Sequence, residues 1–373
     1  MEKIDTIYGN IHVIERKRSD LQNIRSMAGG HMNSNVLIIG AGKINEVKST
    51  LEEASISGKI LYVSDPYVDT IYGGIIRPQM EAVGQIIEQK VENNTIAYAM
   101  EIAECVMSGD VNCIVAMGGG KTLDIGKYAA FVSKRPFLSI PTSMAHDGIV
   151  SPIAVLKRRD GKPKSLGCAM PSMMLMDTGL IASCPSELIK AGIGDIISNY
   201  LALKDWNFAV SRGKDEMNGY AYMMSRTAVD ALLKTQFDHI CPDFLDVLAN
   251  CLVMSGIAME YAGSSRPVSG SEHLFSHALD YFGRKQNLHG LNVALGTVAG
   301  LKTIGEDPAV IVDFLKKFEV DINPQRMESP EDTFIYCMQH ATEMRNDRYT
   351  FLHEADLSEK KLRKIYRELV EEL

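Results

Sequence analysis

The chain has 373 residues, 46% hydrophobic and 23% charged, which fits a globular protein of about two domains. Its formal net charge of -8 argues against a nucleic-acid partner, because phosphate neutralisation dominates such binding. Seven cysteines without a C-x-x-C pair favour reduced thiols in a cytoplasmic protein. The beginning "MEKIDTIYGNIHVIERKR" lacks the apolar segment of a signal peptide. We also find no apolar run long enough for a membrane span.

The first half alternates short apolar runs with helical patterns, which predicts βαβ units and a parallel sheet. The predicted strands lie at 35–43, 58–66, 113–121 and 135–143, with further strands within 152–177 and a hairpin tip at "RRDGKPK". We expect helices at 44–54 and around 76–92 between the first strands.

After about residue 180, long apolar-periodic stretches predict helices only. They lie at 187–210, 216–237, 243–262, 271–283, 289–303, 307–318 and 330–344, and a charged amphipathic helix ends the chain. The fold class is therefore α/β: a Rossmann-like parallel-sheet domain at 1–180, followed by an all-α domain at 181–373.

Two glycine turns follow predicted strands. "GAGK", with Gly40 and Gly42, is a fragment of a dinucleotide fingerprint and is explained equally well as a tight strand-to-helix turn. Asp65 closes the next strand, where a carboxylate either bonds ribose hydroxyls or caps the following helix. "MGGGKTLDIGK" is more specific, because three glycines let backbone N–H groups at a helix start approach a pyrophosphate.

The segment "SIPTSMAHDGIVSP" also follows a strand, and ligands of open α/β sheets bind at the carboxyl ends of strands. Its hydroxyl groups, on Thr142, Ser143 and Ser151, suit contacts with a nicotinamide or a phosphate. Asp147 is a carboxylate able to hold a substrate hydroxyl. Each of these residues is also typical of an ordinary turn.

Three of the nine histidines lie close together in "SGSEHLFSHALDYFGRKQNLHG". His273 and His277 share one helix face, and His289 begins the next helix. Ser269 and Glu272 fit a capping box, which makes Glu272 structural. Asp195, framed by glycines at the start of an apolar helix, offers a carboxylate, and two imidazoles with a carboxylate suit a catalytic metal. A capped helix with surface histidines explains the same pattern.

The blocks "GGGKTLDIGK", "PTSMAHDGIVSP", "GDIISNYLALKDW", "SGSEHLFSHALD" and "HGLNVALGT" resemble the iron-containing alcohol dehydrogenase and glycerol dehydrogenase superfamily. The closer resemblance, over about residues 36–300, is to its sn-glycerol-1-phosphate dehydrogenase branch. The segment 64–79 departs from the pattern and leaves Asp69 without a role.

The resemblance implies that Asp195, His273 and His289 hold one divalent ion: zinc, nickel, iron or manganese. The resemblance also implies that Asp147 and His277 are catalytic residues that contact the substrate. Asp195 is expected to contact the substrate as well. The resemblance further implies an NAD(H) or NADP(H) site. Because Asp65 closes the second strand, where a carboxylate would repel a 2′-phosphate, we expect NADH to be favoured. The matching cofactor residues are Gly118, Gly119, Gly120, Lys121, Thr122, Asp124, Thr142, Ser143 and Ser151.

By the same resemblance, the expected reaction is NAD(P)H-dependent reduction of dihydroxyacetone phosphate to sn-glycerol 1-phosphate, a lipid backbone, by a homo-oligomer. The helix starts after "GGGK" and "AGIG", together with Lys204 and Arg266, are candidate phosphate contacts. A glycerol or other polyol dehydrogenase is the alternative enzyme. A dehydroquinate synthase-like cyclase and a degenerate nucleotide-binding module are more distant readings.

Overall fold

The computed structural model describes residues 36–283 and 285–373, and these residues form one compact unit. The predicted absence of a signal peptide and the first 35 residues of the predicted sheet domain lie outside the described residues.

Six parallel strands form the main sheet, in the order β1-β8-β5-β4-β2-β3. The strands are β1 (Val36–Gly40), β2 (Gly58–Ser64), β3 (Gly84–Lys90), β4 (Val111–Gly118), β5 (Phe137–Pro141) and β8 (Met173–Asp177). Residues of β5 and β8 are buried throughout, whereas the edge strands β1 and β3 are partly exposed. This matches the continuous apolar runs that predict parallel strands covered on both faces.

Helices connect these strands. They are η2 (Lys43–Glu46), α2 (Val47–Glu53), α3 (Pro66–Glu81), α4 (Ile96–Ser108) and α5 (Gly120–Ser133), and η3 (Asp147–Ile149) follows β5. The predicted hairpin is present as β6 (Ile153–Lys157) paired antiparallel with β7 (Pro163–Gly167).

The helix predicted around 76–92 is wrong. α3 ends at Glu81, and the residues that follow form edge strand β3. A Cβ added at Gly84 would lie 1.9 Å from the Gly58 carbonyl oxygen, so glycine is needed where β3 begins beside β2. The pairing of β3 with β2 joins residues distant in sequence, so the local periodicity of the sequence does not predict it.

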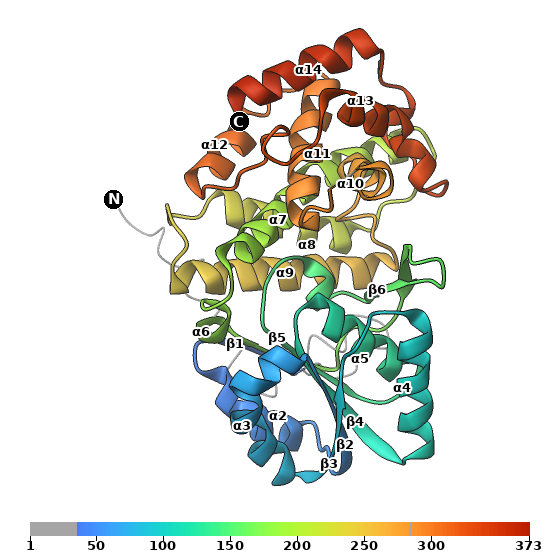
Figure 1. Cartoon of the computed structure of the whole chain (residues 1–373). Coiled ribbons are helices and arrows are strands. Elements are labelled where there is room, and N and C mark those ends of the chain that lie inside the picture. Colours follow the sequence, from blue (N-terminus) through green and yellow to red (C-terminus); the bar gives the residue numbers. More distant parts are fainter. Residues whose placement is uncertain (1–35, 284) are drawn as a thin grey trace. The chain divides into compact units, whose positions relative to one another are not determined.

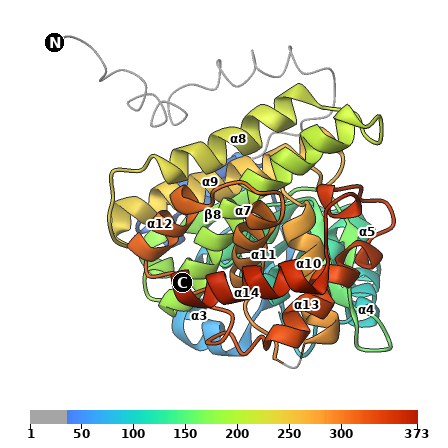
Figure 2. The same ribbon diagram turned by 90° about the horizontal axis from the view of Figure 1, so that it is seen from above.

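All described elements after Asp177 are helical. They are α6 (Thr178–Ile181), α7 (Ser186–Ser211), α8 (Gly219–Leu233), α9 (Pro242–Ala262), α10 (Ser271–Phe282), α11 (His289–Thr303), α12 (Ala309–Lys317), α13 (Glu331–His340), η4 (Ala341–Met344), η5 (Phe351–His353) and α14 (Glu359–Glu372). In Figure 1, α9 runs between the sheet and the other helices, and it contacts η3 and β1. Figure 2 shows α14 lying across α11 and α13, which it contacts.

One hydrophobic cluster extends from the sheet into the helical half, with Met144, Ile149 and Val150 among its members. α9 is long and apolar enough to cross a membrane by length and composition alone, but 61% of the apolar window is buried in the structure. Its apolar surface packs on α7 and α8, as expected of a core helix.

Candidate active site

The glycine-rich turn after β4 lies beside the turn after β5. Gly118 pairs in register with Pro141, and the Thr142 N–H donates to the Gly118 carbonyl over 3.0 Å. α5 begins at Gly120 without a side-chain cap, so its first backbone N–H groups are available to an anion. A Cβ at Gly120 would lie 2.6 Å from Nε2 of His146, so a larger residue here would require the His146 ring to move.

Four further residues predicted to bind the cofactor differ in where they lie relative to the glycine turn. Lys121 is exposed at the helix start, and Ser143 lies close to Gly119. Thr122 and Asp124 are buried beneath the turn. The Asp124 carboxylate accepts a hydrogen bond from the Val155 N–H (2.9 Å). Asp124 therefore anchors β6 to α5.

Lys127, which the sequence analysis did not single out, strengthens this anchor. Its side chain is 1% exposed, and Nζ lies 3.3 Å from Oδ1 of Asp124. Nζ also donates to the carbonyl oxygens of Gly148 (2.5 Å) and Ile153 (2.6 Å). A buried ammonium group thus fixes the loop that carries Asp147 to α5.

In the first glycine turn, which follows β1, backbone N–H groups are already hydrogen-bonded within the protein. The N–H groups of Gly42 and Ile44 donate to the buried carboxylate of Asp177 over 3.1 and 2.7 Å. Gly42 has φ 76°, a conformation that glycine adopts without strain. The tight-turn interpretation therefore accounts for Gly40 and Gly42, and their contact with a cofactor stays a prediction.

Asp65 is the N-cap of α3. Its Oδ1 accepts hydrogen bonds from the N–H groups of Tyr67 (2.9 Å) and Val68 (3.1 Å). The capping alternative is thus present, and a contact with ribose stays a prediction. Asp69 is paired with Arg77 and Lys90 at the ends of β2 and β3, which gives this residue the structural role that the sequence left open.

Asp195, His273 and His289 come together from α7, α10 and α11. One potential ligand atom from each lies within 4.8 Å of the others. The Nε2 atoms of the two histidines are 3.2 Å apart, and Nε2 of His289 is 3.7 Å from Oδ1 of Asp195.

Asp195 lies well inside α7 rather than at its start, which corrects the sequence-based placement. The surrounding glycines have a packing role. A Cβ at Gly194 would lie 2.3 Å from the Gly290 carbonyl oxygen, and one at Gly290 would lie 1.8 Å from that of Ala191. The glycines let α7 and α11 approach closely, which brings Asp195 to His289.

The predicted capping box is also wrong. α10 begins at Ser271 with Gly270 as its N-cap and no side-chain cap. Glu272 is fully buried, its Oε1 accepts from the Gly270 N–H (2.6 Å), and it lies 2.8 Å from Nδ1 of His273. A carboxylate behind an imidazole fixes the ring and its tautomer, as in metal sites.

The donor set fits a divalent metal ion. Burial lowers the pKa of His273 to about 4 and that of His289 well below its ordinary value, so both imidazoles are neutral, as metal ligands must be. Burial raises the pKa of Asp195, and the nearby Asp147 carboxylate adds to this effect. A cation among these groups would favour the ionised carboxylate.

The predicted substrate residues lie next to this set. The Asp147 N–H donates to Oδ2 of Asp195 over 2.8 Å, and Oδ2 of Asp147 accepts from Oγ of Ser255 over 2.8 Å. The ring of His277 is 6.3 Å from the rings of both His273 and His289. Ser151 is buried, and its N–H donates to the Asp147 carbonyl (3.1 Å).

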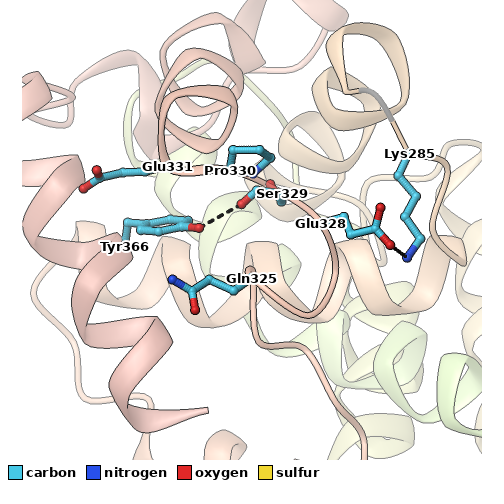
Figure 3. Close-up of a pocket in the computed structure, with 7 residues that line it drawn as sticks. All are labelled: Lys285, Gln325, Glu328, Ser329, Pro330, Glu331 and Tyr366. Atoms are coloured by element: carbon cyan, nitrogen blue, oxygen red, sulfur yellow. Dashed lines mark hydrogen bonds and ion pairs between the residues drawn. The ribbon is translucent and has the colours of Figure 1, made fainter.

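A pocket of about 640 Å³ lies elsewhere, and none of the described residues that line it belongs to the predicted site (Figure 3). Its charges are paired, with Nζ of Lys285 2.6 Å from Oε1 of Glu328, and Tyr366 donates to the Ser329 carbonyl over 3.0 Å.

Comparison with known proteins identifies the family. Residues 38–185 match the family model described as iron-containing alcohol dehydrogenase. The glycerol-1-phosphate dehydrogenase [NAD(P)+] of Hyperthermus butylicus is 33% identical over 86% of this chain and 93% of its own. That of Sulfurisphaera tokodaii is 34% identical over 88% and 94%. The chain belongs to the iron-containing alcohol dehydrogenase family, in its glycerol-1-phosphate dehydrogenase branch.

Solved structures of this family have the same fold. Glycerol dehydrogenase from Schizosaccharomyces pombe superposes with a TM-score of 0.73 at 17% identity, over 91% of this chain and 89% of its own. A probable glycerol dehydrogenase from Sinorhizobium meliloti gives a TM-score of 0.71 at 18% identity, over 91% and 97%. The predicted α/β fold class, with a parallel sheet followed by helices, is thus confirmed.

Proposed function

We propose that this protein reduces dihydroxyacetone phosphate to sn-glycerol 1-phosphate with NAD(P)H and one divalent metal ion. The observation that carries the proposal is the convergence of Asp195, His273 and His289 in a chain whose relatives are named glycerol-1-phosphate dehydrogenases. The sequence blocks that resemble this branch contain these same residues.

The residues divide the work. The uncapped N–H groups of α5 bind the cofactor pyrophosphate, with Thr142, Ser143 and Ser151 toward the nicotinamide. A divalent ion held by Asp195, His273 and His289 would polarise the substrate carbonyl as a Lewis acid. Asp147 and His277 orient the terminal hydroxyl of the substrate, and Glu272 keeps His273 in the correct tautomer.

Proton transfer belongs to the same groups. Hydride addition to the carbonyl carbon leaves an oxygen that must take up a proton. Burial lowers the pKa of His277 to about 4, so its ring is neutral; it can give its N–H proton to this oxygen while its other nitrogen takes up a proton from solvent. Ser255 fixes the orientation of Asp147, because its Oγ donates to Oδ2 of Asp147 over 2.8 Å and accepts from Nδ2 of Asn199 over 3.2 Å.

The proposal extends to the location of the protein, the use of its product, its metal ion and its assembly. All seven cysteines are free thiols, which supports a cytoplasmic location. The product would serve as a glycerophospholipid or ether-lipid backbone. We propose zinc as the ion because its tetrahedral preference suits three protein ligands and one open position, and a homo-oligomer as the assembled form.

The test is a substrate panel with metal-replete enzyme. Two or three charge-assisted hydrogen bonds to a phosphate, each about 1.5–3 kcal/mol, should favour dihydroxyacetone phosphate over dihydroxyacetone by about a hundredfold or more in kcat/KM. Equal or better turnover of dihydroxyacetone would replace this function with that of a polyol dehydrogenase.

A further inference from the structure

The segment between η4 and η5 brings two arginines to the start of α10. Arg348 is 3% exposed, and its guanidinium donates to the Ser269 carbonyl and to Oγ of Ser265 (3.0 Å). Arg345 donates to the same Ser265 oxygen from Nη1 over 3.1 Å. One hydroxyl oxygen therefore lies between two guanidinium groups.

This segment is fixed against the helix that carries two of the site histidines. The buried carboxylate of Asp205 accepts from the Ser271 N–H (2.7 Å) and from the Phe351 N–H (2.9 Å). Ser271 is the first residue of α10, and His273 and His277 follow in its first two turns. The Asp205 carboxylate thus holds the segment with the two arginines against the start of α10.

The positive charge of this cluster is only partly neutralised. Arg348 makes no ion pair with any described residue, and the partner of Arg345 is Asp347, whose side chain is 69% exposed. Burial lowers the pKa of Arg348 to about 9, and the charge of Arg345 adds to this effect. Adjacent, partly buried cations are costly unless an anion joins them.

The two guanidinium groups lie at Ser265 and Ser269, just before the helix that carries His273 and His277. Burial lowers the pKa of His277, and the charges of His273, Arg345 and Arg348 lower it further. The two side chains predicted from the sequence as phosphate contacts already have carboxylate partners. Lys204 is paired with Glu306 over 2.8 Å, and Arg266 is paired with Asp215 over 2.6 Å.

We infer that Arg345 and Arg348 bind the phosphate of the substrate, a monoester dianion whose ketone end points toward His277. The inference rests on the proposed function and names the groups that select the phosphorylated ketone. Guanidinium forks match the oxygens of a phosphate in a bidentate way. The cofactor pyrophosphate has its own site at α5, so the two anions do not compete.

Asp347 holds the place of the phosphate. Its carboxylate accepts from Nε (3.1 Å) and Nη2 (2.7 Å) of Arg345, the edge of the fork that a phosphate would use. Because an exposed ion pair of this kind is weak, the substrate dianion displaces it. Removal of the Asp347 charge should therefore strengthen phosphate binding, which a purely structural role of the pair would not produce.

The experiment measures kcat/KM for dihydroxyacetone phosphate and dihydroxyacetone, and competitive inhibition by inorganic phosphate. The variants are Arg345→Gln, Arg348→Lys and Asp347→Asn. The control is Arg226→Gln, whose exposed arginine pairs with Asp230 within α8. Arg345→Gln and Arg348→Lys should each lower the preference for the phosphorylated ketone about tenfold or more, through loss of charge-assisted bonds. Asp347→Asn should tighten phosphate inhibition, and the control should change neither value.

The outcomes separate the two proposals. If wild-type enzyme prefers the phosphorylated ketone but Arg345→Gln keeps both that preference and the phosphate inhibition, the inference is overturned. If the wild type shows no preference, the proposed function fails, and phosphate inhibition that still depends on Arg345 upholds the anion site. An NADH KM raised together with the phosphate effect would assign the arginines to the cofactor and overturn the inference. Because Arg348 is buried, failure of its variant to fold leaves the decision with Arg345→Gln.

Discussion

The backbone N–H of Asp147 donates to the side chain of Asp195 across 2.8 Å. This bond joins the loop after β5 to the middle of α7, so a residue of the sheet half and one of the helical half meet in the site. Burial raises the pKa of both carboxyl groups. Two buried acids in contact call for a cation nearby, which is the basis of the first prediction.

We expect His273→Ala or His289→Ala to lose most of the bound metal and all but residual activity, because each removes one of three ligands. Elemental analysis of purified variants measures the metal directly. His277→Ala should retain the ion and lose kcat/KM, since its ring lies beside the ligand set rather than within it. Undiminished metal in His289→Ala would disprove the ligand assignment.

Glu272→Gln should weaken metal affinity about 10- to 100-fold while leaving the ligands in place, the usual effect of removing a carboxylate behind a ligating imidazole. A competition titration with a chelator of known affinity measures the change. The matched control is Glu260→Gln, an exposed position on α9, which should leave metal affinity unchanged. Equal affinities for all three proteins would reduce Glu272 to a packing role.

Secondary structure that depends on neighbouring residues is predicted well from the sequence. The strands before the glycine turns, the hairpin β6–β7 and the long helices follow from apolar runs and periodicity. The common edge of the sheet also follows, because parallel strands place their carboxyl ends together, and this predicts that Gly118 and Thr142 lie side by side.

Contacts between distant segments are less visible in the sequence. Ser255 reaches Asp147 from 108 positions away, and nothing in the pattern of α9 distinguishes it from other small core residues. Glu272 has the spacing of a capping box, but burial turns its carboxylate toward His273. The glycines around Asp195 are the one feature of the sequence that marks this region. Their role, the close packing of α7 on α11, becomes evident only when both helices are placed together.

Ser255→Ala should lower kcat by about tenfold without loss of metal, because it removes the hydroxyl that fixes Oδ2 of Asp147 at 2.8 Å. A hydrogen bond to a charged group contributes about 1.5–3 kcal/mol, which covers this change. Steady-state kinetics and metal analysis on the same preparation provide the measurement. Ser255→Thr, which retains the hydroxyl, is the rescue variant.

NADH should serve at least as well as NADPH, because Asp65 stands at the end of β2, where a 2′-phosphate would meet a negative charge. The neighbouring cations do not compensate, since Arg77 and Lys90 are paired with Asp69. Asp65→Asn should shift the ratio of kcat/KM values toward NADPH and retain part of the cap on α3. A strong NADPH preference in wild type that survives Asp65→Asn would show that this residue does not face the ribose.

Lys127→Met should destabilise the protein by about 3–5 kcal/mol, the usual cost of breaking a buried ion pair from one side. The substitution leaves Asp124 without its cation, and burial already raises the pKa of that carboxyl against the opposing charge of Lys127. It also leaves the carbonyls of Gly148 and Ile153 without their donor. Urea unfolding measures the change, and Lys121→Met, at an exposed position of the same helix, should stay within about 0.5 kcal/mol of wild type.

The double variant Lys127→Met, Asp124→Asn should be more stable than Lys127→Met alone, because it removes the orphaned charge while the amide oxygen can still accept from the Val155 N–H. The coupling energy of this cycle should be about 0.5–3 kcal/mol. Activity should recover less than stability, since the two carbonyls that position the Asp147 loop still lack the ammonium group. Additive effects in the cycle would mean that Lys127 acts on the loop alone, and that its pairing with Asp124 contributes nothing to the fold.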